Sequence, residues 1–430
     1  MPGGQKCKVL RGRAGVSKLT TRAAATASTA QNLERALEQT HAWLTSRDYS
    51  GYEPYDLLNS PYFAAGIFRR PPLSFALIQF GRRVAGLRMR ELLRIPPSKN
   101  PKALGLVLSG LCDLTRSGDD YWQQANDLKS TLLRLRSPNE TEFCWGYDWD
   151  YMSLRGTKLP AFSPNCIASY FCGQALVDMA EVFSDREATE MAESVGRFIA
   201  TRLNRSVDTS EHLCLSYTPA DRTVIYNSSA LAGVYLARLA SLKPNAEYLS
   251  LARRAMNYVQ SEQLAEGGWY YGGLRRQHWI DGFHTSYVLC ALHDYRRYTG
   301  DPSFDECIRR GHAYYNATFF ASDCAPKYFH NQLYPIDIHS CSQAILHYCT
   351  FAEDDPSAMN RALDMFRWTQ QNMMTKDGAY YFQRHRMWIN RAEYVRWGQA
   401  WMFRALASLR LSLRRERTQV GDLLSIAGRN

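Results

Sequence analysis

Blocks of small and apolar residues alternate with more charged blocks along this chain, and the alternation recurs at a nearly constant spacing. Each unit has an aromatic, polar loop, a segment with helical periodicity, a short turn and a second helical segment. The loops give way to helices at Asn165, Asn227, His284, Ser340 and Trp397, which are 62, 57, 56 and 57 residues apart. Such a period is typical of supersecondary units that bury their apolar faces only against neighbouring units.

The two helical segments of each unit differ in composition. The first is rich in Ala, Gly, Ser and Cys as well as Leu, and a helix that is apolar on nearly every side is buried. These inner helices are predicted at 102–116, 165–183, 227–241, 283–298, 339–352 and 396–411. The second segments carry more charge, and these outer helices are predicted at 31–46, 120–136, 185–203, 244–263, 303–317 and 356–374. Six pairs predict an all-α fold, an (α/α)6 toroid over residues 31–411, in which the first helix closes against the last.

The net charge of +11 belongs mainly to the two ends of the chain. Residues 1–22 contain six Lys or Arg and no acid, and residues 404–430 contain six Arg against Glu416 and Asp422. Subtracting +6 and +4 leaves about +1 for the body. We therefore expect a disordered basic N-terminal tail over 1–30 and a basic C-terminal tail over 412–430. A nearly neutral body is not the basic face that nucleic-acid binding needs, so no nucleic-acid partner is expected.

The ends and the cysteines bear on location. The N-terminal composition resembles an organellar transit peptide, although a disordered extension is the favoured interpretation, and no apolar secretory segment is present. No run of 18 apolar residues indicates a transmembrane segment. The 11 cysteines are odd in number and form no CxxC pair, which favours reduced thiols. A cytoplasmic location is predicted, with a membrane-peripheral one as the alternative.

The loops between the pairs are long, aromatic and charged, and all of them precede inner helices. They therefore fall on one face of the toroid and surround its mouth, while the short turns lie on the other face. Residues 51–63 form another irregular stretch, and residues 73–94 are expected to form a helix that ends at Pro96-Pro97. Long loops on a rigid scaffold are where function usually resides.

Carboxylates and histidines in these loops are the candidate catalytic groups. Paired carboxyl groups suit glycoside hydrolysis, and histidine suits general acid or base catalysis. Asp281 and Asp337 stand where helices begin, so N-capping is an equally weighted interpretation. The candidates are Asp148, Asp150, Asp281, His284, Asp337 and His339.

The same loops offer groups that could hold a sugar. Aromatic rings can stack on sugar rings, and an arginine fork suits a carboxylate or phosphate, so an anionic sugar is one expectation. Packing is the competing interpretation for the aromatics, and pairing with nearby acids for the arginines. The candidate substrate-binding residues are Glu53, Asp56, Trp145, Tyr217, Trp269, Trp279, Tyr334, Trp388, Arg391 and Arg396.

Neither metal nor cofactor is expected. Two clusters, Cys144/Cys166/Cys172 and His339/Cys341/His347, contain metal-ligating types but lack a recognised zinc spacing. The run QLAEGGW (263–269) looks like the Gln–Trp repeat of terpene cyclases, but it occurs once. It is interpreted as the end of a helix.

Together these residues resemble the six-hairpin glycosidase-like superfamily of hydrolases, lyases and sugar epimerases. More narrowly, GYEPYDLLNS (51–60), LRMRELLRIPPSKNPKALGL (87–106) and RWGQAWMFRAL (396–406) look like VpsJ-type bacterial polysaccharide-biosynthesis proteins. The resemblance implies a role in polysaccharide or exopolysaccharide metabolism and brings no catalytic assignment. A sugar 2-epimerase of this fold would use a His pair on inner helices, and the helix at 396–411 has no His.

The leading hypothesis is a carbohydrate-active enzyme that uses acid/base chemistry without a metal, as a hydrolase, lyase or epimerase. The first alternative is a non-catalytic glycan-binding or scaffold protein, with polysaccharide-assembly proteins as partners. A weaker alternative is an isoprenoid-processing toroid, which would have an apolar cavity rather than one ringed by Asp and Arg.

Overall fold

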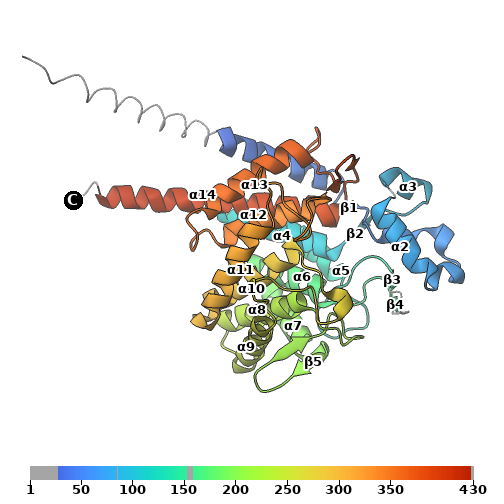
Figure 1. The fold of residues 1–430 in the computed structure, drawn as a ribbon, viewed down its shortest axis with the longest axis horizontal. Helices are drawn as coiled ribbons and strands as arrows, with labels where there is room; N and C mark the ends of the chain where they lie inside the picture. The colour runs from blue at the N-terminus through green and yellow to red at the C-terminus, as the bar shows by residue number, and fades with distance from the viewer. Residues whose placement is uncertain (1–27, 85, 153–157, 428–430) are drawn as a thin grey trace, which may run out of the picture.

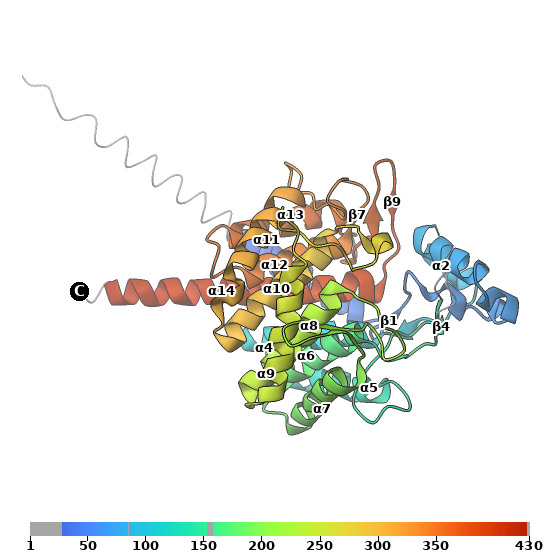
Figure 2. The ribbon, with the colours of Figure 1, turned by 60° about the horizontal axis from the view of Figure 1, so that its bottom comes forward.

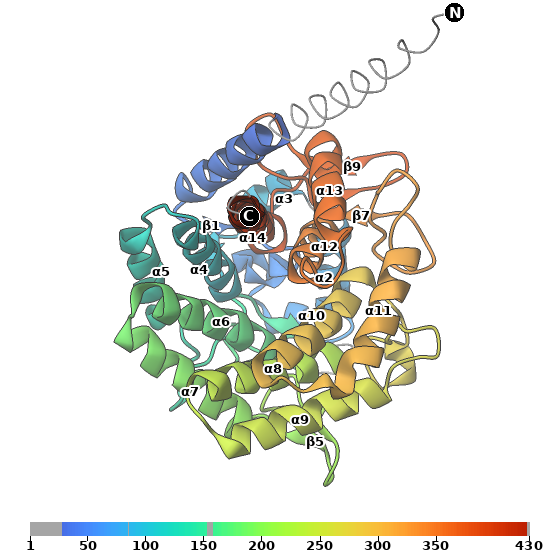
Figure 3. The same ribbon diagram turned by 90° about the vertical axis from the view of Figure 1, so that its left-hand side faces the viewer.

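The computed structural model describes residues 28–84, 86–152 and 158–427, and within them the helices form a ring of two layers (Figures 1 and 3). The inner helices are α4 (Pro101–Arg116), α6 (Cys166–Phe183), α8 (Tyr226–Leu242), α10 (Gly282–Thr299), α12 (Ile338–Thr350) and α14 (Ala400–Ala427). The outer layer consists of residues 28–45, α5 (Trp122–Arg134), α7 (Arg186–Arg202), α9 (Ala246–Ser261), α11 (Asp305–Thr318) and α13 (Ala358–Met373). The predicted (α/α)6 toroid is confirmed.

Burial explains the two layers. Every residue of α8 from Tyr226 to Ala240 is buried, as the small and apolar composition of this segment predicts. Each inner helix contacts the next, and α14 returns to contact α4, which closes the ring. The helix at 28–45 packs beside α14, where His41 stacks on Phe403 with ring centroids 5.2 Å apart. The first and last units of the chain therefore complete one continuous core.

At the two ends of the chain and in residues 73–94, the observed helices differ in extent from the predicted ones. The tail at 1–27 lies outside the described residues, and residues 28–30 are already helical. Helix α14 continues past residue 411 to Ala427, into the stretch expected to be a tail. The single helix expected at 73–94 is wrong, because it divides into α2 (Leu73–Arg83) and α3 (Leu87–Leu92). Gly86 stands before α3 in an extended conformation that interrupts the helical path.

Residues 51–99 form a separate protruding unit, here called the mouth lobe (Figures 1 and 2). Its ends meet where β1 (Ser50–Gly51) pairs with β2 (Ser98–Lys99). Besides α2 and α3 it contains the short 3-10 helices η1 (Asp56–Asn59), η2 (Pro61–Phe63) and η3 (Gly66–Arg69). The lobe stands at the end of the ring opposite the C-terminus of α14.

The other short strands lie in the long loops. They are β3 (Tyr151–Met152) with β4 (Lys158–Leu159), β5 (Arg205–Asp208) with β6 (Leu213–Leu215), and β7 (Ile336–Asp337), β8 (Gln383–Arg384) and β9 (Ile389–Asn390) in one sheet. All these pairings are antiparallel. In the β7–β8–β9 sheet, pairing of Asp337 with Gln383 ties the loop before α12 to the loop before α14.

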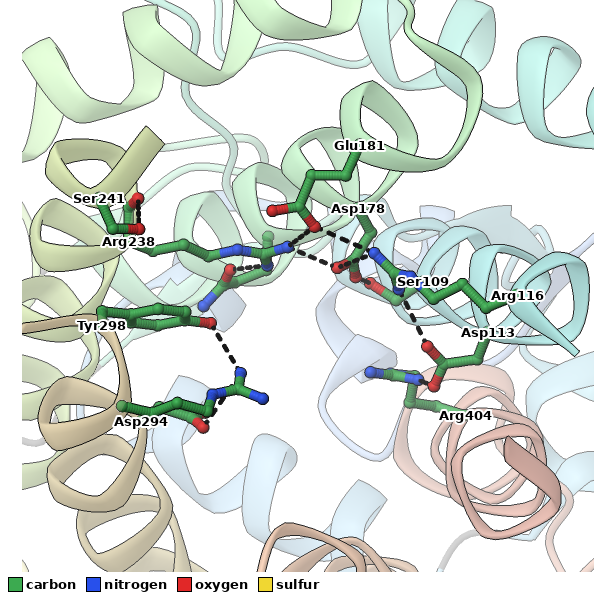
Figure 4. Close-up of polar contacts among 12 residues, drawn as sticks. Ser109, Asp113, Arg116, Asp178, Glu181, Arg238, Ser241, Asp294, Tyr298 and Arg404 are labelled. Atoms are coloured by element: carbon green, nitrogen blue, oxygen red, sulfur yellow. Dashed lines mark hydrogen bonds and ion pairs between the residues drawn. The ribbon is translucent and has the colours of Figure 1, made fainter. Parts of the chain in front are cut away.

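Buried ion pairs tie the inner helices together at the turn end of the ring (Figure 4). The Arg238 guanidinium of α8 donates to Asp178 and Glu181 of α6, each at 2.8 Å. Arg116 of α4 also donates to Glu181, at 3.0 Å, and Arg404 of α14 pairs with Asp113 of α4. Arginines on three sides hold the pKa of Asp178 below its usual range, although burial opposes them. These ion pairs therefore join α4, α6, α8 and α14 at this end of the ring.

One inner helix, α6, is long and apolar enough to span a membrane, but 67% of it is buried within the ring.

Candidate functional site at the mouth

The inner helices begin at the mouth, and polar residues cap several of them. Asn100 caps α4 and Asn165 caps α6, while Asp281 and Asp337 cap α10 and α12 through their side-chain oxygens. Capping satisfies backbone N–H groups that a helix start leaves unpaired. Asp281 and Asp337 thus act as N-caps, the structural alternative to a catalytic role. The two residues differ in what their other side-chain oxygen, Oδ2, contacts.

Asp281 holds His284 in a defined orientation. Its Oδ1 accepts from the His284 backbone N–H at 2.9 Å, and its Oδ2 lies 2.7 Å from Nδ1 of the same residue. A carboxylate only accepts, so this contact places the proton on Nδ1 and leaves Nε2 as the acceptor. Nε2 makes no hydrogen bond with the described residues, and the side chain remains 22% exposed. The pair is therefore oriented as a general base.

A small cavity of about 10 Å³ adjoins this pair. It is lined by Asp281 and His284 together with Asn227, Tyr271 and Thr285, among others. Space of this size holds about one water molecule. A sugar would therefore have to enter above the cavity, on the side of the mouth loops.

Asp337 has a different environment. Its Oδ1 accepts from the His339 backbone N–H at 2.9 Å and from Trp397 Nε1 at 2.8 Å, and its Oδ2 accepts from Gln383 Nε2 at 2.7 Å. Burial raises the pKa of Asp337 to about 6 in spite of these donors. The side chain is fully buried, and it joins α12 to the last loop. Its contacts are structural.

His339 lies deeper, among aromatic rings. Its Nε2 lies 2.7 Å from the Tyr287 hydroxyl, and its ring stacks on Phe283 with centroids 4.4 Å apart. Its Nδ1 is buried without a partner among the described residues. Burial, with nearby Lys102, lowers the pKa of His339 well below its usual value, so the imidazole is neutral. It can therefore either donate a hydrogen bond to the Tyr287 hydroxyl or accept one from it, depending on the tautomer.

A buried ion pair joins the N-terminal loop to the last repeat. Arg396 donates from Nε and Nη2 to Glu53 Oε2, at 3.0 and 2.8 Å. The arginine lies in the π-helical turn η6 (Val395–Gln399) before α14, and its guanidinium carbon lies 4.8 Å from the centre of the Trp149 ring. Burial raises the pKa of Glu53 to about 8, although Arg396 opposes the shift. Both residues were candidate ligands for substrate, and the structure brings them together as partners.

The remaining acidic candidates form hydrogen bonds or ion pairs with other residues of the protein. Asp148 is buried and accepts from Ser98 and Asn100. Asp150 pairs with Arg69 of the mouth lobe and accepts from the Ala161 backbone at 2.9 Å.

Asp56 pairs with Arg90 at 2.8 Å and accepts from the backbone N–H of Glu53 at the same distance. Burial raises the pKa of Asp56 to about 6. This residue therefore shapes the loop that carries Glu53.

The aromatic candidates separate into core, wall and rim. Trp145 and Trp269 are buried, and their indole N–H groups donate to backbone carbonyls; Trp269 also lines the small cavity beside His284. The Tyr217 hydroxyl lies 3.1 Å from that of Tyr147, near Arg396. The exposed rim residues are Trp279, Tyr334, Trp388 and Arg391.

Lys102 is a central residue that the sequence patterns did not indicate. It is 3% exposed, and its ammonium lies 4.4 Å from the centre of the Phe171 ring and 5.1 Å from that of Trp401. It has no carboxylate partner within the described chain. Burial and the charge of Arg396 lower the pKa of this amine well below its usual value. The one available signal was a lysine at the start of an otherwise apolar inner helix, ALGLVLSGL.

An unpaired buried lysine costs stability, so we expect Lys102→Met to raise the free energy of unfolding by about 1 to 4 kcal/mol at neutral pH. Since the folded-state pKa is depressed, the unfolded chain binds a proton that the folded chain does not, and wild-type stability rises with pH up to the ordinary lysine value. The gain should therefore shrink as the pH approaches about 10. Urea titrations of both proteins at several pH values measure it. A less stable but folded Lys102→Met would show that the amine has a stabilising partner.

No group of three or more His, Cys, Asp or Glu in the described part of the chain is arranged to hold a metal ion. This includes both clusters that the sequence offered as conceivable ligands.

No protein-family model and no curated protein matches the chain, but solved structures do. The cellobiose 2-epimerase from Bacillus thermoamylovorans is similar with a TM-score of 0.59, at 13% identity over 74% of this chain and 88% of that one. A sugar epimerase from a ruminal bacterium gives 0.58, at 9% identity over 75% and 90%. A GH76 α-mannanase of Bacteroides thetaiotaomicron gives 0.53, at 10% identity over 75% and 86%.

These similarities show the class of fold, an (α/α)6 toroid. The neighbours belong to the six-hairpin glycosidase-like superfamily, in agreement with the broader of the two resemblances.

Proposed function

We propose that this protein is a carbohydrate-active enzyme that moves a proton on and off a carbon atom of a sugar, as an epimerase or isomerase does. The observation that carries the proposal is the Asp281–His284 pair, whose Nε2 makes no hydrogen bond with the described residues while the side chain stays 22% exposed. The carboxylates Asp148, Asp150 and Asp337 are engaged by protein donors. Among the candidate catalytic residues, His284 thus keeps a ring nitrogen free for proton transfer.

The chemistry would begin with His284. Its Nε2 takes a proton from the carbon next to a sugar carbonyl, and Asp281 stabilises the imidazolium that forms. Tyr287 lies one helical turn further along α10, and the centroids of the Tyr287 and His284 rings are 5.9 Å apart. Burial keeps its hydroxyl protonated by raising the pKa of Tyr287 well above the ordinary value. Tyr287 can donate a hydrogen bond from this hydroxyl to the developing oxyanion, while neutral His339 donates from Nε2 to the hydroxyl oxygen.

The names of neighbouring structures support a sugar substrate. They include epimerases, a D-mannose isomerase and mannanases. The resemblance of residues 51–60, 87–106 and 396–406 to VpsJ-type proteins supports a place in polysaccharide metabolism. We propose both as the setting of the reaction.

Deuterium exchange tests the proposal directly. The full chain is incubated in D2O with a panel of reducing mono- and disaccharides, neutral and uronate, and proton NMR follows the hydrogen next to the carbonyl. We expect loss of this signal, with a new epimer or ketose, for at least one sugar. Absence of exchange across the panel at high enzyme concentration would overturn the proposal.

Glycoside hydrolysis is the second candidate, and one observation favours it. Burial raises the pKa of Glu53, which favours the protonated form that a general acid needs. Buried Asp148 lies near enough to contribute to this shift. Release of reducing ends from an oligosaccharide, without deuterium exchange, would indicate this reaction instead.

A further inference from the structure

Exposed apolar side chains gather on the mouth lobe rather than spreading over the surface. Of the 17 large hydrophobic residues exposed in the described chain, seven come from residues 61–94. They are Tyr62, Ile67, Leu73, Phe80, Val84, Met89 and Leu92. Concentration of this kind usually marks an interaction surface.

The same segment is strongly basic. Residues 61–94 contain seven arginines and a single acid, Glu91. Two of the arginines are used internally, Arg69 with Asp150 and Arg90 with Asp56. Four others are exposed and have no carboxylate partner among the described residues: Arg70, Arg83, Arg88 and Arg94.

Helical spacing places both kinds of residue together. On α2 the buried side carries Ser74, Ile78 and Gly81. The outward side carries Leu73, Ala76, Phe80 and Arg83, which are spaced by three, four and three residues. On α3, exposed Arg88 and Leu92 are four residues apart. Apolar side chains and unpaired arginines therefore share the outward faces.

We propose that the mouth lobe binds the surface of an anionic lipid bilayer. Apolar side chains enter the headgroup region of a membrane, and arginines beside them meet the negative charge of the lipids. The lobe protrudes from the ring (Figure 2), and most of its exposed apolar residues come from η2, η3, α2 and α3. A soft bilayer accepts such scattered insertions without a complementary shape, which a protein partner would need.

Bilayer contact would also bring the candidate site to the membrane. Gly51, where the lobe leaves the ring, approaches Val395 so closely that an added Cβ would lie 2.3 Å from its side chain. Val395 precedes Arg396 in the same π-helical turn. The base of the lobe thus packs against the turn that carries Arg396.

Vesicle flotation with the full chain tests this proposal. Vesicles of phosphatidylcholine, with or without phosphatidylglycerol, are used at low and high salt. Wild-type protein should float with the anionic vesicles, and less so at high salt. The variant Val84→Glu/Leu92→Glu changes side chains that are 66% and 74% exposed, so it should fold normally. Its partition should fall at least tenfold.

Matched controls separate the lobe from the turn end of the ring and from the basic C-terminal stretch. Leu242→Glu/Leu249→Glu introduces the same charges at the turn end of the ring and should float like wild type. Arg70→Glu/Arg83→Glu should weaken binding by about fivefold or more per arginine. Arg414→Glu/Arg415→Glu, in the basic stretch at the C-terminal end, should leave flotation unchanged.

Three results would overturn the proposal. One is failure of wild-type protein to float. Another is normal flotation of Val84→Glu/Leu92→Glu with loss in the Arg414→Glu/Arg415→Glu variant, which would assign binding to the C-terminal end. The third is a lobe variant that changes the oligomeric state in light scattering without changing flotation, which would indicate a protein partner.

Discussion

Replacing His284 by Asn should lower turnover of a sugar substrate by about 10²- to 10⁴-fold, the usual contribution of a positioned acid or base. The effect should fall on kcat more than on KM, because the imidazole acts on the proton that moves. The fold should persist, since His284 is partly exposed and Asp281 still caps α10. Initial rates and melting temperatures of the two proteins measure this.

Two further variants make the interpretation of this experiment more specific. Asp281→Asn keeps the capping oxygen but removes the carboxylate that orients the ring, so it should lose turnover with little loss of stability. His278→Asn changes an exposed histidine in the same loop, stacked on Tyr270, and should behave as wild type. Full activity in His284→Asn would refute the proton-transfer scheme, whatever the sugar.

The helical ring was predictable from the sequence because inner and outer helices face different environments. A helix such as α8 is surrounded by protein, so its small and apolar composition identifies it without reference to any other segment. The predicted inner helices accordingly begin within a few residues of the observed ones. The division of residues 73–94 into two helices was not predicted, because these helices lie on the protruding lobe. Burial there does not impose one continuous pattern of apolar residues.

The candidate site was predictable only where its chemistry is local. Asp281 and His284 are three residues apart, and one helix start explains both capping and orientation of the ring. Glu53 and Arg396 are separated by 343 residues, so no spacing in the sequence could pair them. Lys102 gains its character from rings on α6, α10 and α14 that only the closed ring brings together.

The Glu53–Arg396 pair should be the most sensitive point for stability. At pH 9, above the raised pKa of Glu53, Arg396→Met should lower the free energy of unfolding by about 3 to 5 kcal/mol, because it leaves a buried carboxylate without its partner. Equilibrium unfolding in urea measures the loss. Adding Glu53→Leu should recover most of it, since two apolar side chains of similar volume replace the pair.

The loss should also depend on pH, in a direction set by Glu53. Its pKa is raised from 4.5 to about 8 in the folded protein, so the folded state holds this proton more tightly than the unfolded chain. The resulting stability is fully present below pH 4.5 and is lost as the pH rises through about 8. Without Arg396, no positive charge offsets the burial of the Glu53 carboxylate. Protonation of Glu53 is then the only way to remove the buried negative charge.

Arg396→Met should therefore cost less at pH 6 than at pH 9, and the double variant should show little difference between them. Comparing unfolding curves of wild type and both variants at these two values completes the test. If Arg396→Met lost the same free energy of unfolding at both pH values, the loss would not come from an unpaired, buried Glu53 carboxylate. The arginine would then stabilise the mouth mainly by stacking on Tyr147 and Trp149.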